Sequence, residues 1–242
     1  MLYSSNFTGN FNGQSPMSDA FSTDGNSLMG GISTDTAIPE VSIEQQGTAL
    51  QTAACVSEVN LPTGNPLLDS ALNLARRGFS VVPLKPRTKK PALQDCYNRA
   101  TADLEKLRVL WEREPGLNIG IVPTSGGLCA IDVDVPLGIE SLAALEAFLG
   151  KLPSPTVTVL TPNGGKHLFF RCGKSFPSHN GIASGIDIRS AAGHCVVPPS
   201  LLLEGDYEFE PGHSFDDLEP AELPDSWVRF FALPRRCVRA YY

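Results

Sequence analysis

Short runs of apolar and β-branched residues, separated by turns rich in glycine and proline, recur through the middle of the chain. In several runs apolar and polar side chains alternate, which is the period of a β-strand. The predicted strands span 79–84, 118–122, 128–134, 156–160, 166–171, 185–189, 193–198 and 207–209. Apolar residues at helical spacing predict helices between some strands and at both ends of this region. The chain is therefore expected to have a mixed α/β (α+β) fold, in which a sheet is backed by helices.

Capping residues place the ends of the predicted helices. Asn65 is a good N-cap and Pro66 suits the first helical position, so the first helix is expected to begin there and to end at Gly78. Thr101 is expected to cap the second helix. The third helix is expected over about 138–148, with Leu142, Leu145 and Phe148 facing inward. The fourth is expected from 225 onward and contains Trp227, Phe230 and Phe231, of which Trp227 is expected in the core.

Composition divides the chain into three parts. Residues 1–62 are rich in Ser, Thr, Gly, Asn and Gln, and their apolar residues follow no period, which predicts a disordered polar tail. Residues 63–210 are expected to form one folded domain, and residues 211–242 an acidic flank with a short C-terminal helix. The net charge is −7, yet residues 61–203 hold 15 Lys and Arg against 11 Asp and Glu. The acidic balance therefore does not exclude a polyanionic ligand for the central part.

The six cysteines are widely spaced and form no CxxC motif, which predicts free thiols in a cytoplasmic protein. The first residues lack the basic and apolar segments of a signal peptide, and no apolar run approaches the ~20 residues of a membrane span. A zinc site from Cys172, His179, His194 and Cys195 is an alternative, although this spacing matches no zinc motif. His179, His194 and His213 are interpreted instead as surface or structural residues.

Two carboxylates lie close together on the predicted strand 128–134. Asp132 and Asp134 alternate with Ile131 and Val133, so a strand would place the acids on one face and the apolar residues on the other. Like charges at this spacing repel, and the pair therefore favours a bound cation or a raised pKa. The alternative is a strand end that runs into a turn, where aspartate is common.

Two later strands carry polar residues with the same alternation. His167 lies on strand 166–171, and Asp187 shares one face of strand 185–189 with Arg189. Three aspartates can hold two Mg²⁺ or Mn²⁺ ions, because hard cations prefer carboxylate oxygens. Two such ions can clamp the attacking and leaving oxygens of a displacement at phosphorus. His167 and Arg189 would then neutralise phosphate groups.

A basic loop precedes these strands. Residues 85–90 contain four basic residues within six positions, Lys85, Arg87, Lys89 and Lys90. Such a loop can grip phosphates, and its alternative is a solvated surface loop. The chain shows no Walker A loop, serine nucleophile elbow or dinucleotide fingerprint.

Several short motifs follow one another along residues 66–210. They are Arg77-Gly78-Phe79, Val82-Pro83-Leu84, Lys89-Lys90-Pro91, Ala100-Thr101-Ala102-Asp103, Asn118-Ile119-Gly120-Ile121, Ile131-Asp132-Val133-Asp134, the residues from Thr161 to His167, those from Gly185 to Arg189, and Val197-Pro198-Pro199-Ser200. In this order and spacing, the set resembles the bifunctional DNA primase/polymerase (prim-pol) domain of the archaeo-eukaryotic primase superfamily.

The resemblance implies an RRM-like catalytic sheet packed on a smaller N-terminal α/β unit, within residues 63–210. It implies a nucleotidyltransferase, a DNA primase or DNA-directed polymerase, that adds nucleotides from NTPs or dNTPs for replication priming or primer extension. The residues that match the family's catalytic set are Asp132, Asp134, His167 and Asp187, and the three acids among them match its ligands for two Mg²⁺ or Mn²⁺ ions. The residues that match nucleotide-binding positions are His167, Arg189, Lys166 and Lys89.

The implied partners are a single-stranded DNA template, NTPs or dNTPs, and a replicative helicase that is a separate protein or lies outside this sequence. Replication of a phage, plasmid or other mobile element is the context that the family suggests. Two other interpretations remain open. A catalytically degenerate relative would bind single-stranded DNA in a replication-initiation complex, and a metal-dependent nuclease would use the same acids.

Overall fold

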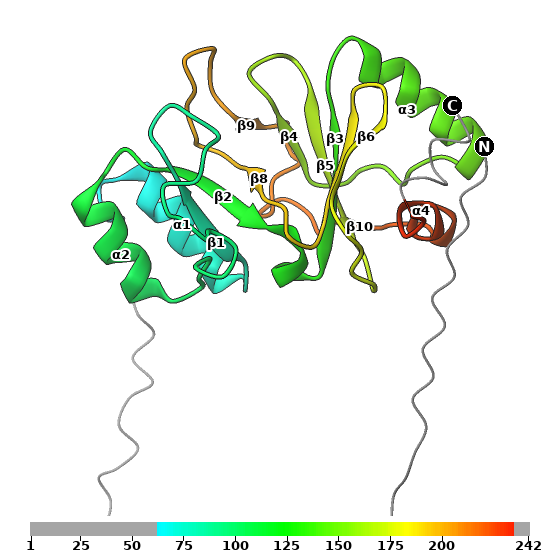
Figure 1. The fold of residues 1–242 in the computed structure, drawn as a ribbon. Helices are drawn as coiled ribbons and strands as arrows, with labels where there is room; N and C mark the ends of the chain where they lie inside the picture. The colour runs from blue at the N-terminus through cyan, green and yellow to red at the C-terminus, as the bar shows by residue number, and fades with distance from the viewer. Residues whose placement is uncertain (1–61, 235–242) are drawn as a thin grey trace, which may run out of the picture. The chain divides into compact units, whose positions relative to one another are not determined.

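The computed structural model describes residues 62–234, which form four α-helices and ten strands (Figure 1). The helices are α1 (Pro66–Arg76), α2 (Leu104–Arg113), α3 (Leu137–Leu149) and α4 (Asp225–Phe231). The strands are β1 (Ser80–Leu84), β2 (Asn118–Val122), β3 (Leu128–Val133), β4 (Thr158–Leu160), β5 (Lys166–Arg171), β6 (His179–Ala183), β7 (Ile186–Arg189), β8 (Cys195–Val196), β9 (Glu208–Phe209) and β10 (Ala221–Glu222). The mixed α/β (α+β) class is confirmed. The tail predicted over 1–62 lies outside the described residues, except for its last position.

The first part of the described chain packs two helices against a small sheet. The side chain of Asn65 accepts hydrogen bonds from the backbone N–H groups of Leu67 and Leu68, so α1 begins where its capping sequence predicts. The sheet has the order β1-β2-β8, and both of its strand pairs are antiparallel. Because β8 comes late in the chain, this sheet ties the N-terminal helices to the segment that follows β7.

The second sheet has seven strands. Its order is β6-β7-β3-β5-β4-β9, and β10 pairs with β5 in parallel, whereas the other pairs are antiparallel. Strand β3 lies at the centre, with β5 on one side and β7 on the other. Side chains that point to the same face of these three strands therefore form rows across the middle of the sheet.

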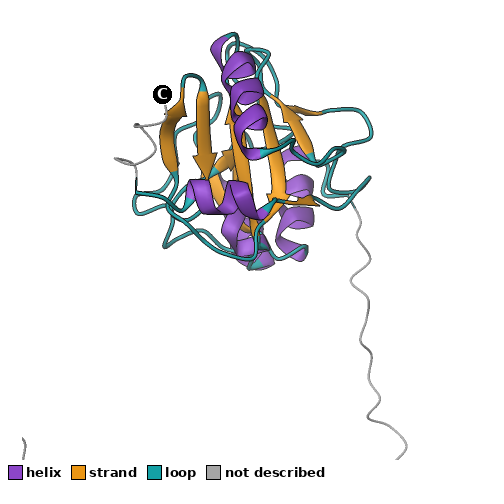
Figure 2. Ribbon diagram, turned by 90° about the vertical axis from the view of Figure 1, so that its right-hand side faces the viewer, coloured by secondary structure: helices purple, strands orange, loops and turns teal. Residues whose placement is uncertain are grey.

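Both faces of the seven-stranded sheet are covered. Ala130 of β3 belongs to the apolar core shared with α1, α2 and the small sheet, whereas its neighbours Ile131 and Val133 belong to a second core beneath α3 and α4. Figure 2 looks onto the face that α3 and α4 cover. A polar group on either face of β3 must therefore find partners or line a cavity, because apolar side chains surround it.

Helix α4 is part of the second core. Trp227 and Phe231 are fully buried, the indole N–H of Trp227 donates to the carbonyl oxygen of Gly150 at 2.9 Å, and the hydroxyl of Ser226 donates to that of Leu149 at 2.7 Å. These bonds join α4 to the C-terminal end of α3. Among the helices of residues 62–234, none has the length and apolar character needed to cross a bilayer.

The predicted cap of the second helix is wrong. Asp103, not Thr101, caps α2, because its carboxylate accepts hydrogen bonds from the backbone of Glu105 at 3.1 Å and Lys106 at 3.2 Å. Thr101 instead exchanges two backbone hydrogen bonds with Val81 of β1. That pairing holds Thr101 in an extended conformation just before the helix.

One buried position and several strand bounds also differ from the prediction. Phe148 was expected to face inward from α3, but its side chain is 64% exposed. The helical spacing of apolar residues did not identify the buried face of α3, because this helix is apolar on nearly every side. The strand predicted over 193–198 is limited to two residues, and the strands β6 and β10 were not predicted.

Candidate active site

Three of the predicted site residues form a row across the seven-stranded sheet. Asp132 on β3 lies directly opposite His167 on β5 and directly opposite Asp187 on β7. Residues paired in this way have Cβ atoms roughly 4.5–5.5 Å apart on the same face. Alternation along each strand places Asp132, His167 and Asp187 on the same face of the sheet. The register of the two strand pairs then brings the three side chains together.

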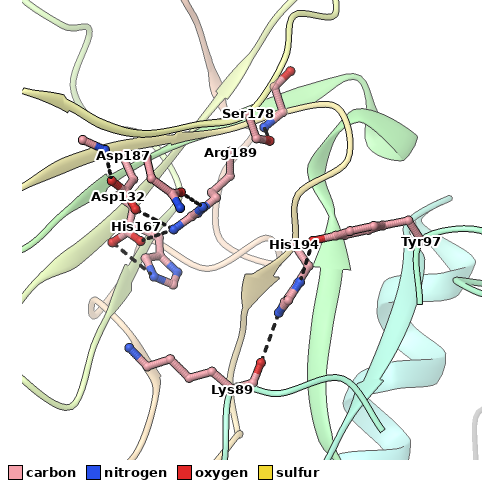
Figure 3. Close-up of polar contacts among 11 residues, drawn as sticks. Lys89, Tyr97, Asp132, His167, Ser178, Asp187, Arg189 and His194 are labelled. Carbon is pink, nitrogen blue, oxygen red and sulfur yellow. Dashed lines mark hydrogen bonds and ion pairs between the residues drawn. The ribbon is translucent and has the colours of Figure 1, made fainter. Parts of the chain in front are cut away.

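The row opens into a cavity of about 570 Å³ between this sheet and the segment around β8. Figure 3 shows the polar side chains that face one another across it. The predicted site residues among its lining are Asp132, Asp134, His167, Asp187, Arg189 and Lys89. The cavity therefore gathers acids and cations from separate strands and from the basic loop.

Arg189 neutralises two of the acids. Its Nη2 atom lies 2.6 Å from Oδ2 of Asp187 and 3.7 Å from Oδ2 of Asp132. The other oxygen of Asp187 accepts a hydrogen bond of 2.6 Å from the backbone N–H of Gly181. The Oδ1 atom of Asp132 lies 3.5 Å from Nε2 of His167. The guanidinium thus stands where a bound cation would balance the same charges.

Asp134 follows the last residue of β3 and is held by its backbone. Its N–H donates to the carbonyl of Gly185 at 2.8 Å, and its carbonyl accepts from the N–H of Gly138 at 2.7 Å. A Cβ on Gly138 would lie 2.5 Å from the oxygen of Gly185, so α3 and β7 approach here more closely than any side chain allows. This contact fixes the turn that presents Asp134 at the edge of the cavity.

Burial shifts the pKa values of three cavity side chains, Asp132, Asp134 and His167. It raises the pKa of Asp132 to about 6, with the nearby charges of Arg189 and Asp187 acting in opposite directions. Burial also raises the pKa of Asp134. Burial, followed by the positive charges of Lys89 and Arg189, lowers the pKa of His167 to about 4, so its ring is neutral near pH 7.

The Asp132→Asn variant is expected to be more stable than the wild type at pH 8, by about 2 to 3 kcal/mol when divalent cations are chelated. The pKa of Asp132 is about 6 in the folded protein against an ordinary value of 3.8. Between these values the folded state holds more protons than the unfolded state, so stability falls as pH rises. Urea unfolding in EDTA at pH 8 and pH 4 measures the difference. A gain that does not shrink toward pH 4 would contradict this assignment.

The donor set suits a hard divalent cation. Three carboxylates line one cavity, and Mg²⁺ and Mn²⁺ prefer carboxylate oxygens. In the part of the chain that the structure describes, no group of three or more His, Cys, Asp or Glu side chains is arranged to hold a metal ion. Two of the three carboxylates, Asp132 and Asp187, are engaged by the guanidinium of Arg189.

Two buried polar groups also mark the site. The Nδ1 atom of His167 and the hydroxyl of Tyr207 are buried and meet no hydrogen-bond partner at normal bonding distance among residues 62–234. The backbone of Val196 nonetheless lies close enough to His167 to act on its pKa, so the hydroxyl of Tyr207 is the clearer case. The two rings lie against each other, with centroids 5.7 Å apart. Buried polar groups normally have partners, so the hydroxyl of Tyr207 favours a polar ligand in this part of the cavity.

The two predicted lysines have different positions. Lys89 extends from the basic loop toward the side of the cavity where His167 lies (Figure 3). Lys166 does not reach the cavity. It precedes His167 on β5 and therefore points to the opposite face, where its Nζ pairs with Oε1 of Glu210 at 2.7 Å. Lys166 therefore does not line this cavity.

Several cavity residues were not predicted. They are Tyr97, Ser178, His179, Asn180, His194, Cys195 and Tyr207. His179 and His194 were interpreted as surface or structural residues, with the zinc site as the alternative, and His194 lay within the predicted strand 193–198 without an assigned role. The alternative zinc site gains no support from the geometry, since Cys172 does not line the cavity with His179, His194 and Cys195.

Comparison with known proteins identifies the family. The family model for the bifunctional DNA primase/polymerase, N-terminal (Prim-Pol) domain matches residues 71–226, which is more than half of the chain. A search of curated proteins found no match. The matched range includes every residue of the row, Asp134, Arg189 and Lys89. The chain therefore belongs to the Prim-Pol family of bifunctional DNA primases/polymerases.

Proposed function

We propose that this protein is a metal-dependent primase-polymerase that transfers nucleotides from NTPs or dNTPs to a growing strand on a single-stranded DNA template. Membership of the Prim-Pol family supports primase/polymerase-type function in general, with nucleic acid and nucleotides as substrates. The observation that carries the finer proposal is the convergence of three acids, a neutral histidine and two cations on one cavity. A protein that only binds DNA would have no use for three acids beside a phosphate path.

The acids would hold the metal. Asp132, Asp134 and Asp187 would bind two Mg²⁺ or Mn²⁺ ions, which would supply Lewis-acid stabilisation of the charge that develops at the reacting phosphate. Arg189 would release at least one of its two carboxylate contacts when the ions bind. Its guanidinium, still held beside the row, would then be available to a phosphate oxygen in a bidentate contact.

The remaining groups would bind the triphosphate. The neutral ring of His167 can donate one N–H to a phosphate oxygen without adding a buried charge. Lys89 would contribute an ammonium from the other wall of the cavity. Together with Arg189, these groups would hold the leaving pyrophosphate while the 3′-hydroxyl of the strand attacks the α-phosphate.

Primer extension tests this proposal directly. The wild-type chain is expected to lengthen a 5′-labelled primer on a single-stranded template when dNTPs or NTPs and Mg²⁺ or Mn²⁺ are present, and EDTA is expected to abolish the extension. Incubation with metal but without nucleotides serves as the control, because shortening of the DNA in that arm would indicate a nuclease. Absence of extension with every combination of template, metal and nucleotide would refute the proposal.

A further inference from the structure

A chain of hydrogen bonds runs along the cavity wall that faces the acids (Figure 3). The Nε2 atom of His194 lies 3.2 Å from the carbonyl oxygen of Lys89, and its Nδ1 atom lies 3.5 Å from the hydroxyl of Tyr97. A carbonyl oxygen only accepts, so Nε2 must carry the hydrogen. Nδ1 of the neutral ring is then an acceptor, and the hydroxyl of Tyr97 donates to it. Each of the two contacts therefore has a defined donor.

The ring of His194 is fixed from a second side. It packs on Gly120 of β2, where an added Cβ would lie only 3.2 Å from Cδ2 of the imidazole. His194 also immediately precedes β8, which pairs with β2. Because the small sheet holds this ring and the ring is bonded to the basic loop, His194 connects the loop to the small sheet.

The other hydrogen bonds of the basic loop are made by the residues on either side of Lys89. Within the loop, Lys90 accepts at its carbonyl from the N–H of Lys85 at 2.8 Å, and the N–H of Lys90 donates to the hydroxyl of Thr88 at 3.1 Å. Asn118 of β2 donates to the carbonyl of Thr88 at 3.2 Å. These bonds, together with the N–H of Ala92 that donates to the carbonyl of Pro83 at 2.9 Å, fix the loop on both sides of residue 89. The bond from His194 holds the backbone of Lys89 itself, at the point where the side chain enters the cavity.

We propose that His194 is a positioning residue, which holds the backbone of Lys89 so that the ammonium group meets the phosphates of the incoming nucleoside triphosphate. The inference rests on the proposed function, since it assigns Lys89 to the triphosphate. A lysine side chain has many rotamers, and fixing its backbone reduces the conformational freedom that nucleotide binding must remove. Loss of the bond should therefore weaken nucleotide binding and leave the chemical step nearly unchanged.

The variants His194→Phe and His194→Gln separate the bond from the packing. Phenylalanine keeps a ring on Gly120 but has no donor, whereas the amide of glutamine can donate from a position close to that of Nε2. His194→Phe is expected to raise the KM for nucleotide and the Kd for a fluorescent nucleoside triphosphate about tenfold, with kcat within about threefold of the wild type. His194→Gln is expected to restore most of the affinity. His213→Phe, at a histidine outside the cavity, is the matched control.

A double-mutant cycle identifies Lys89 as the residue through which His194 acts. If His194 works by placing Lys89, the double variant Lys89→Ala plus His194→Phe should bind nucleotide no more weakly than Lys89→Ala alone. If the two losses multiply, His194 acts in some other way and the inference is overturned. Should His194→Phe not fold, Gly120→Ala is the second variant, because its Cβ would lie 3.2 Å from the ring of His194 and push it by a few tenths of an ångström. It is expected to raise the nucleotide KM as well, by a smaller factor than His194→Phe.

The outcomes also distinguish this inference from the proposed function. If the wild type neither binds nucleotide nor extends a primer, both fail. If the wild type extends a primer and Lys89→Ala weakens nucleotide binding, while His194→Phe behaves as the wild type, only the role of His194 fails. A rise in KM for His194→Phe that glutamine does not restore would show that packing, and not the hydrogen bond, is responsible.

Discussion

Primer extension by the Asp187→Asn variant is expected to fall about a thousandfold, which corresponds to about 4 kcal/mol of lost transition-state stabilisation. Asparagine keeps the shape of the side chain and one acceptor oxygen for the N–H of Gly181. It removes the charge that the proposed metal site needs, and with it the partner of Arg189 at 2.6 Å. The measurement is the rate of single-nucleotide addition at saturating nucleotide.

Asp216→Asn is the matched control for this variant. Asp216 also pairs with an arginine, Arg77, but its side chain is 67% exposed and lies outside the cavity. Its extension rate should equal that of the wild type within about twofold, because surface ion pairs contribute little. If Asp187→Asn extends primers as fast as Asp216→Asn, Asp187 has no part in the chemistry and the proposed site is wrong.

Trp227→Ala is expected to lower the free energy of unfolding by about 4 kcal/mol, the cost of a large cavity in a core. Trp227 is fully buried, packs on Phe231 with ring centroids 5.7 Å apart, and donates a hydrogen bond to the carbonyl of Gly150. Its removal would leave that carbonyl without its partner and open the core beneath α3. Urea unfolding at equilibrium measures the change.

Two further variants, Trp227→Phe and Leu203→Ala, serve as controls for the loss of Trp227. Trp227→Phe retains an aromatic ring and should cost about 1 to 2 kcal/mol, mainly through the lost hydrogen bond and volume. Leu203→Ala removes a large apolar side chain that is 77% exposed, and it should change stability by less than about 0.5 kcal/mol. A cost below about 1 kcal/mol for Trp227→Ala would mean that α4 does not contribute to the folded core.

Alternation along single strands could be predicted well from the sequence. The bounds of β5 agree with the predicted strand 166–171, and β7 differs from its prediction by one residue. The shared face of Asp187 and Arg189 follows from the same period, because Ile186 and Ile188 enter the core beneath α3 and α4. The opposite placement of Lys166 could have been predicted in this way too, since neighbours on a strand cannot share a face.

What the sequence could not supply is which residues meet across strands. His167 and Asp187 lie 35 and 55 positions after Asp132, and only the order β7-β3-β5 places them on its two sides. The same holds for His194 and Tyr97, which come from loops and follow no period. Their positions depend on the pairing of β8 with β2 and on the close packing that Gly120 permits. The local pattern of apolar and polar residues does not predict such long-range contacts.

The row of Asp132, His167 and Asp187 has a consequence for misfolding as well as for chemistry. A slip of one residue in either strand pairing would turn one of these polar side chains into the core beneath α3 and α4 and turn an apolar neighbour out of it. Burying an unpaired carboxylate or imidazole there costs free energy, so a sheet with shifted strand pairing would be less stable than the native one. The residues proposed to act on nucleotides therefore also serve as register markers that exclude the wrong alignments of the strands carrying them.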